Sequence, residues 1–269
     1  MKDLFIDIET YSSVDLSSAG AYKYIESPDF EILIIGYALD DGPVVSLDLL
    51  QDGKETAEFE EFILLLTNPN VRKHAHNAVF ERLAFKRIGY DIPAKEWYCT
   101  SVLAAYCGLP LSLDQISKVL DLENKKQETG KLLIKYFSCP CKPTKVNGRR
   151  TRNYPVHAPE KWDMYIEYNR YDVLAEREIY QKLSKYQISE TERRLYVLDQ
   201  AINDKGIMVD RELAESAIVV DTVYTEQLTN QARALTHLDN PNSVMQLKAW
   251  IRQETGEDVD SFAKGAIDD

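Results

Sequence analysis

The sequence lacks long apolar runs, contains little cysteine and has no excess of basic residues. No stretch of about 18 or more apolar residues occurs, which argues against a membrane-spanning helix. The first residues lead directly into a charged, strand-like segment, so we expect no signal peptide. The 4 cysteines in 269 residues indicate free thiols in a reducing compartment, and we expect the protein to be cytoplasmic.

The charge balance is acidic, with 32 Lys and Arg against 44 Asp and Glu and a net charge of −12. This balance argues against broad electrostatic adhesion to nucleic acid. It remains compatible with an enzyme that binds a short piece of nucleic acid, because bound metal ions and a small basic patch can offset an acidic background. The hydrophobic content of 44% is that of an ordinary soluble globular protein, and the length predicts about two domains.

The most informative stretch is residues 4–9, Leu-Phe-Ile-Asp-Ile-Glu, which reads as a short buried strand. Asp7 and Glu9 are two residues apart, so both side chains point to the same face of the strand. Two carboxylates in a core-forming strand are costly unless a cation pairs with them, and Mg²⁺ or Mn²⁺ prefers such oxygen ligands. The alternative is a strand that ends in an ordinary solvated acidic turn.

The remaining pattern predicts an α/β domain over residues 1–188, followed by a separate helical segment over 189–269. Further strands are expected at 31–39, 44–50 and 71–77, and the first two of these are expected to form an antiparallel meander with the opening strand. Helices are expected at 56–66, 78–88, 100–107, 112–121 and 129–137, and a long helix at 159–185. In the second segment, charged amphipathic helices are expected at 190–204, 211–235 and 243–253.

Two more acidic sites occur along the chain. Glu81 falls in the first turn of a predicted helix, where the helix dipole favours an anion. Tyr168 and Asp172 are four residues apart in the long helix and therefore share one face. Each site has a plain alternative: Glu81 as a helix-dipole partner, and Asp172 as a surface partner of Arg170 or Arg177.

Taken in order, the three sites resemble the three motifs of the DEDD superfamily of 3′–5′ exonucleases, in its tyrosine variant DEDDy, which has a ribonuclease-H-like fold. The matching segments are Asp7-Ile8-Glu9-Thr10, Asn77-x-x-Phe80-Glu81 and Tyr168-x-x-x-Asp172. The pattern is most similar to proofreading domains of family A DNA polymerases, particularly those of phages and prophages. It covers about residues 1–188 and departs from the superfamily at Glu81, where aspartate is usual.

The resemblance implies two divalent cations, Mg²⁺ or Mn²⁺, about 4 Å apart and held by Asp7, Glu9, Glu81 and Asp172. These cations would activate the attacking water and stabilise the leaving 3′ oxygen. Tyr168 is expected to orient the water, because a phenol that titrates near pH ~10 is a poor general base.

Substrate contacts are also implied by the motifs. Thr10 would contact the terminal nucleotide, and Asn77 belongs to the second motif. Phe80 offers a surface on which a base can stack, although a core position is the favoured interpretation.

A basic stretch lies between residues 138 and 158 and contains no acidic residue. It is expected to be an exposed loop that contacts DNA phosphates, and the alternative is a solvated, disordered loop. Its basic residues are Lys142, Lys145, Arg149, Arg150 and Arg152. Cys139 and Cys141 lie in the same stretch, but their spacing lacks the paired ligands of a structural zinc site.

Residues 201–210 and 242–247 resemble segments that open the polymerase domain of family A enzymes, but no palm-domain metal motif follows. We therefore expect no DNA synthesis from this chain, whether it is a fragment of a longer polymerase or a stand-alone nuclease. The expected function is a two-metal-dependent 3′–5′ exonuclease of proofreading type, acting on single-stranded or frayed DNA. The alternatives are an exoribonuclease and a nucleic-acid-binding module that braces a polymerase. The four acidic residues argue against the binding module, and the polymerase-like segments favour DNA.

Overall fold

The computed structural model describes residues 1–123, 130–186 and 188–262, and its chain divides into two compact units. The first unit is Met1–Lys205 and the second is Gly206–Asp269. Residue 129, at which one expected helix begins, lies outside the described residues, as do parts of both expected domains (124–129, 187 and 263–269).

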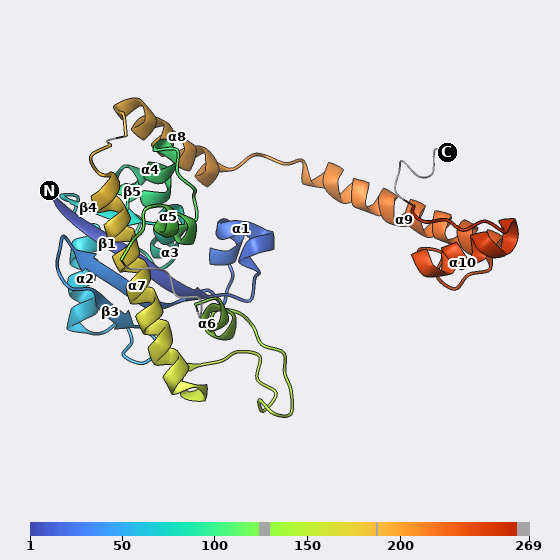
Figure 1. Cartoon of the computed structure of the whole chain (residues 1–269), viewed down its shortest axis with the longest axis horizontal. Helices are drawn as coiled ribbons and strands as arrows, with labels where there is room; N and C mark the ends of the chain where they lie inside the picture. Colours follow the sequence, from blue (N-terminus) through green and yellow to red (C-terminus); the bar gives the residue numbers. More distant parts are fainter. Residues whose placement is uncertain (124–129, 187, 263–269) are drawn as a thin grey trace. The chain divides into compact units, whose positions relative to one another are not determined.

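The first unit is built on a five-stranded mixed sheet (Figure 1). Its strands are β1 (Lys2–Tyr11), β2 (Glu31–Leu39), β3 (Val45–Asp48), β4 (Val71–Ala75) and β5 (Trp97–Cys99). They lie in the order β3-β2-β1-β4-β5, with β1 antiparallel to β2 and parallel to β4. Helices pack on the sheet, which confirms the predicted α/β, ribonuclease-H-like class.

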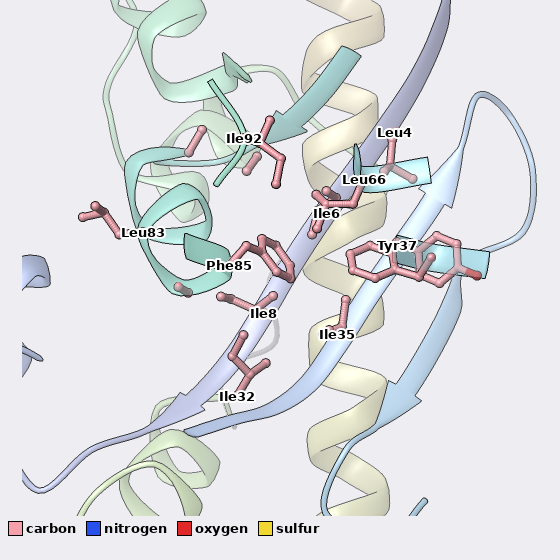
Figure 2. Packing of buried hydrophobic residues seen from close by; sticks show 14 of the residues in the cluster. Leu4, Ile6, Ile8, Ile32, Ile35, Tyr37, Leu66, Leu83, Phe85 and Ile92 are labelled. Atoms are coloured by element: carbon pink, nitrogen blue, oxygen red, sulfur yellow. The ribbon is translucent and has the colours of Figure 1, made fainter. Parts of the chain in front are cut away.

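Strand β1 is buried on both faces, and its alternating side chains divide between two layers. Leu4, Ile6 and Ile8 belong to a core cluster that also takes in residues of α2 (Ala57–Thr67) and α3 (Val79–Arg87), part of which Figure 2 shows. Because neighbouring side chains on a strand point to opposite faces, Asp7 and Glu9 face the other layer. That layer is formed by the long helix α7 (Pro159–Leu183), which packs on β1 and β2.

The remaining helices of this unit are α1 (Leu16–Ile25), α4 (Thr100–Tyr106), α5 (Leu113–Val119), α6 (Gly130–Phe137) and α8 (Glu190–Lys205). Helix α1 and strand β5 were not expected. Helix α1 buries only Tyr24 and Ile25 and is interrupted at Gly20, whose φ is 78°, so it shows little helical periodicity. Strand β5 has only 3 residues, too few for an alternating pattern.

Helix α8 belongs to the first compact unit, so this unit extends beyond the boundary expected at 188/189. The Arg82 guanidinium, only 3% exposed, forms an ion pair of 2.7 Å with Asp204 of α8. It also donates a hydrogen bond of 3.1 Å to the Gln200 amide oxygen. These polar contacts attach a helix that the sequence shows only as charged and amphipathic, and the division of the chain falls between Lys205 and Gly206.

The second unit contains α9 (Arg211–Thr236) and α10 (Val244–Thr255). Asp210 and Ser243 are the N-cap residues: their side chains accept hydrogen bonds from the backbone N–H groups of Leu213 and Gln246. The helix expected at 243–253 is confirmed as α10. Within the described part of the chain, no helix has both the length and the apolar character needed to cross a bilayer.

Candidate metal centre

Three of the predicted carboxylates converge between the sheet and helix α7. Asp7, Glu9 and Asp172 each offer one carboxylate oxygen, and these oxygens lie within 4.8 Å of one another. Strand β1 supplies the first two because they are two residues apart, and α7 brings Asp172 across the same face of the sheet. The first and third motifs therefore meet in space although they are far apart in the sequence.

Neutral donors hold two of these carboxylates. The Asn169 amide nitrogen donates to the Asp7 carbonyl oxygen at 3.0 Å and to Asp7 Oδ2 at 2.7 Å. The Tyr165 hydroxyl donates to Glu9 Oε2 at 2.5 Å and lies 2.7 Å from the Ser138 hydroxyl. Such donors orient the carboxylates without cancelling their charge, so the negative charge remains available to a cation.

Sequence reasoning missed both Asn169 and Tyr165. The available signal was the buried stripe of α7, in which Tyr165, Asn169 and Asp172 follow one another at spacings of three and four residues. The polar partners on β1 could not be read from that stripe, because they depend on how α7 crosses the sheet.

Glu81 lies in the first turn of α3, as predicted, and its side chain is directed into the protein. The residue is 4% exposed, and its Oε2 atom has no hydrogen-bond partner. Burial raises the pKa of this carboxyl well above its usual value, and the nearby charge of Asp7 raises it further. Glu81 is not part of the three-carboxylate group. Strand β4 runs parallel to β1 with His74 opposite Phe5, so the chain leaves β4 for α3 near Asp7, in the middle of β1.

Tyr168 is almost completely buried on α7, at 1% exposure. Burial raises the pKa of its phenol far above the ordinary value, and the charges of Asp172, Glu9 and Asp7 act in the same direction. The hydroxyl therefore stays protonated and acts as a hydrogen-bond donor. Gly130 of α6 makes room for the ring, since a Cβ atom at this position would lie 2.1 Å from the Tyr168 Cε2 atom.

Glu176 is a further buried carboxyl that the sequence analysis did not single out. It follows Asp172 by one helical turn and is 1% exposed. Neither of its carboxylate oxygens has a hydrogen-bond partner. Burial raises its pKa well above the usual value, and the charges of Glu81 and Asp7 contribute in the same direction.

The three expected substrate contacts occupy different environments. Thr10 is 6% exposed, and its hydroxyl lies 3.0 Å from the Tyr24 hydroxyl. Asn77 is exposed and has a left-handed φ of 70°, a conformation that asparagine tolerates better than most residues. Phe80 packs against the core with its ring 5.9 Å from that of Tyr24, in agreement with the favoured interpretation.

The basic stretch folds into an ordered loop. The backbone N–H of Cys141 donates to the Thr151 carbonyl at 2.7 Å, and that of Arg149 donates to the Thr144 carbonyl at 2.8 Å. These hydrogen bonds argue against the alternative of a disordered loop. Lys142, Lys145 and Arg149 are exposed on it.

The other two basic residues make contacts within the protein. Arg150 donates to the Asn153 side-chain oxygen at 2.7 Å. Arg152 forms an ion pair of 2.5 Å with Glu31, and its guanidinium lies 3.8 Å from the centre of the Tyr11 ring. Arg152 therefore attaches the loop to the ends of β1 and β2, and its charge is offset by a partner that lies outside the stretch.

The chain is similar to some known proteins and solved structures. No family model matches the chain. Among solved structures, the chain is similar to an apo form of a nuclease (TM-score 0.40, 15% identity, 74% of this chain and 79% of that one). It is also similar to the POL domain of Pol1 from M. smegmatis in complex with DNA primer-template and dNTP (TM-score 0.49, 16% identity, 92% of this chain and 36% of that one). Both TM-scores are low, so the fold assignment rests on the sheet order and strand directions described above.

A curated relative gives a much stronger match. The DNA polymerase of Bacillus phage SP02 is 47% identical over 270 residues, which cover 100% of this chain and 41% of the relative. The chain thus spans about two fifths of that polymerase. The resemblance drawn from the motifs is confirmed to this extent: the chain is related over its whole length to part of a phage DNA polymerase.

Proposed function

We propose that this chain is a two-metal-dependent 3′–5′ exonuclease that hydrolyses phosphodiester bonds at the 3′ end of single-stranded or frayed DNA, in a proofreading role. The observation that carries the proposal is the meeting of Asp7, Glu9 and Asp172 within 4.8 Å, in a chain related to a DNA polymerase. Like charges held this close repel one another unless a cation lies between them.

The donor set fits hard divalent cations. Every candidate ligand is a carboxylate, the ligand type that suits Mg²⁺ and Mn²⁺, and the buried Oε2 atom of Glu81 has no protein partner. Asp7, Glu9, Asp172 and Glu81 would hold the cations. When bound, such cations activate water for attack and stabilise the charge on the leaving oxygen.

The protein's own groups would position the reactants. Asn169 and Tyr165 hold Asp7 and Glu9 in fixed orientations, which reduces the reorganisation needed on binding. Tyr168 keeps its proton and would donate a hydrogen bond that orients the attacking water, so it does not serve as the general base.

Substrate contact is proposed for the exposed part of the loop and for the motif residues. Lys142, Lys145 and Arg149 are free to approach phosphates, whereas Arg150 and Arg152 mainly fix the loop. Thr10, Asn77 and Phe80 are proposed to line the path of the terminal nucleotide. The relative named DNA polymerase favours DNA over RNA, and we propose that the second unit begins a polymerase region. We also propose that the chain acts in DNA replication and that it is located in the cytoplasm.

The test is a cleavage assay on 5′-labelled single-stranded DNA with Mg²⁺, Mn²⁺ or EDTA. We expect a ladder that shortens from the 3′ end with either metal and no cleavage in EDTA. Asp7→Ala and Asp172→Ala should each reduce the rate by at least about a hundredfold, because each removes a ligand of the proposed centre.

Asp163→Ala is the matched control, since Asp163 is an exposed aspartate on the same helix as Asp172. A parallel assay with 5′-labelled RNA of the same sequence separates the exoribonuclease alternative. If DNA stays intact under all conditions while the protein still retards it on a gel, the exonuclease proposal fails and the binding-module alternative replaces it.

A further inference from the structure

Glu176 shares a face of α7 with the proposed centre. Tyr168, Asp172 and Glu176 are spaced four residues apart, so their side chains follow one another along one side of the helix. All three are buried, and Glu176 is 1% exposed. The carboxyl group of Glu176 therefore lies inside the protein, one helical turn beyond the third motif.

No protein group accounts for this buried carboxyl. Both of its oxygens lack hydrogen-bond partners, and among the described residues no Lys, Arg or His forms an ion pair with Glu176 or Glu81. A buried polar group without a partner destabilises a fold, and a protonated carboxyl would still need an acceptor for its proton. Asp7 and Glu9, in contrast, each receive a hydrogen bond from a neutral side chain.

The charged groups that act on Glu176 include Glu81, the acidic residue of the second motif. The charges that act on it are those of Glu81, Asp7, Cys99 and Asp172, and Glu81 contributes most among these. Glu81 is itself buried and has an unpartnered oxygen. Position 81 is also where the sequence departs from the motif pattern that it resembles, with a side chain one methylene longer than aspartate. The charge of Asp7 acts on both glutamates, and neither glutamate belongs to the group formed by Asp7, Glu9 and Asp172.

Resting on the proposed two-metal function, we propose that Glu176 is a fifth carboxylate of the centre, and that Glu81 and Glu176 together with Asp7 hold the second divalent cation. Asp7, Glu9 and Asp172 hold the first. A cation between Glu81 and Glu176 would partner their unsatisfied oxygens and offset the repulsion between them. The longer side chain at position 81 is suited to sharing a cation with a residue on another helix.

The test counts bound Mn²⁺ on the whole chain by electron paramagnetic resonance and calorimetric titration. We expect two Mn²⁺ ions per chain in the wild-type protein. Glu176→Gln, which keeps the shape and removes the charge, should weaken one of them by at least about tenfold and leave the other unchanged. Glu167→Gln is the matched control, because Glu167 is an exposed glutamate on the same helix, and it should bind both ions as the wild type does.

Glu81→Gln provides a second variant, which should weaken the same Mn²⁺ ion. Thermal unfolding in EDTA checks the fold, and Glu176→Gln should be no less stable than the wild type there, because it removes a buried unpartnered acid. Unchanged Mn²⁺ binding in Glu176→Gln, together with lower stability in EDTA, would show a purely structural role and overturn the inference. Failure of the wild-type chain to bind Mn²⁺ would instead overturn the metal-dependent function as a whole.

Discussion

At the scale of single residues, the carboxylates depend on neighbours that carry no charge. Tyr165 is the clearest case, since its hydroxyl donates to Glu9 at 2.5 Å from a completely buried position. Tyr165→Phe removes this bond and changes little else in the packing. A hydrogen bond to a charged group contributes about 1.5–3 kcal/mol, so we expect the rate of 3′ cleavage to fall by about tenfold or more.

Tyr171→Phe is the control for this change, as it makes the same substitution on the same helix away from Glu9. The two variants are compared by single-turnover cleavage and by melting temperature in EDTA. Equal rates for both variants would show that the Tyr165 hydroxyl does not position Glu9.

At the scale of elements, the spacing between β2 and α7 fixes where the third motif lies. Gly36 of β2 permits this spacing, because a Cβ atom there would lie 2.2 Å from Asn169 Oδ1 and 2.9 Å from Val173 Cγ2. Gly36→Ala should push α7 away from the sheet and break the bond from Asn169 to Asp7. We expect a loss of about 1–3 kcal/mol in the free energy of unfolding. The cleavage rate and the affinity for Mn²⁺ should also fall, by more than a loss of stability alone would cause.

The Gly53→Ala variant separates the loss of stability from the loss of metal binding. Its φ of 77° strains an alanine, but a Cβ atom there meets open space. This variant should lose stability, measured by denaturant unfolding, and keep its metal binding. A Gly36→Ala protein that binds Mn²⁺ as well as Gly53→Ala does would contradict the proposed role of the β2–α7 spacing.

The elements themselves were largely predictable, and the contacts between them were not. Apolar runs located β1 and β2, and helical patterns located α2, α3 and α7, because each has a wide buried surface. The paired acids of β1 and the four-residue spacing of Tyr168 and Asp172 were visible for the same reason. Glu176 lies on that spacing too, but a lone glutamate on a charged helix looks solvated. Its burial, like the Arg82–Asp204 pair that attaches α8, depends on tertiary packing that a local pattern does not contain.

At the scale of the whole molecule, the buried acids link stability to pH. The pKa values of Glu81 and Glu176 are raised in the folded protein, so the folded state binds more protons than the unfolded chain above the ordinary value of 4.5. Their contribution to stability is therefore present below pH 4.5 and is lost as the pH rises through the folded pKa values. In EDTA, the melting temperature of the wild type should fall as the pH rises above 4.5, relative to that of a Glu81→Gln/Glu176→Gln double variant.

The comparison with the double variant is needed because His74 acts in the opposite direction: burial lowers its pKa, so its contribution to stability is lost as the pH falls. Added Mn²⁺ should raise the melting temperature of the wild type at neutral pH and have a smaller effect on the double variant. Parallel pH curves for the two proteins in EDTA would mean that these carboxyls are not the linked groups.

The two acids of β1 also bear on how the chain is made. Synthesis proceeds from the N-terminus, so β1 leaves the ribosome long before α7, which covers its acidic face in the finished fold. During that interval an apolar strand at the centre of a future sheet has one face uncovered, which is a setting for aggregation. Asp7 and Glu9 keep that face charged until Asn169 and Tyr165 arrive to hold them. The same carboxylates that we propose as metal ligands would thus act earlier as gatekeepers of the nascent sheet.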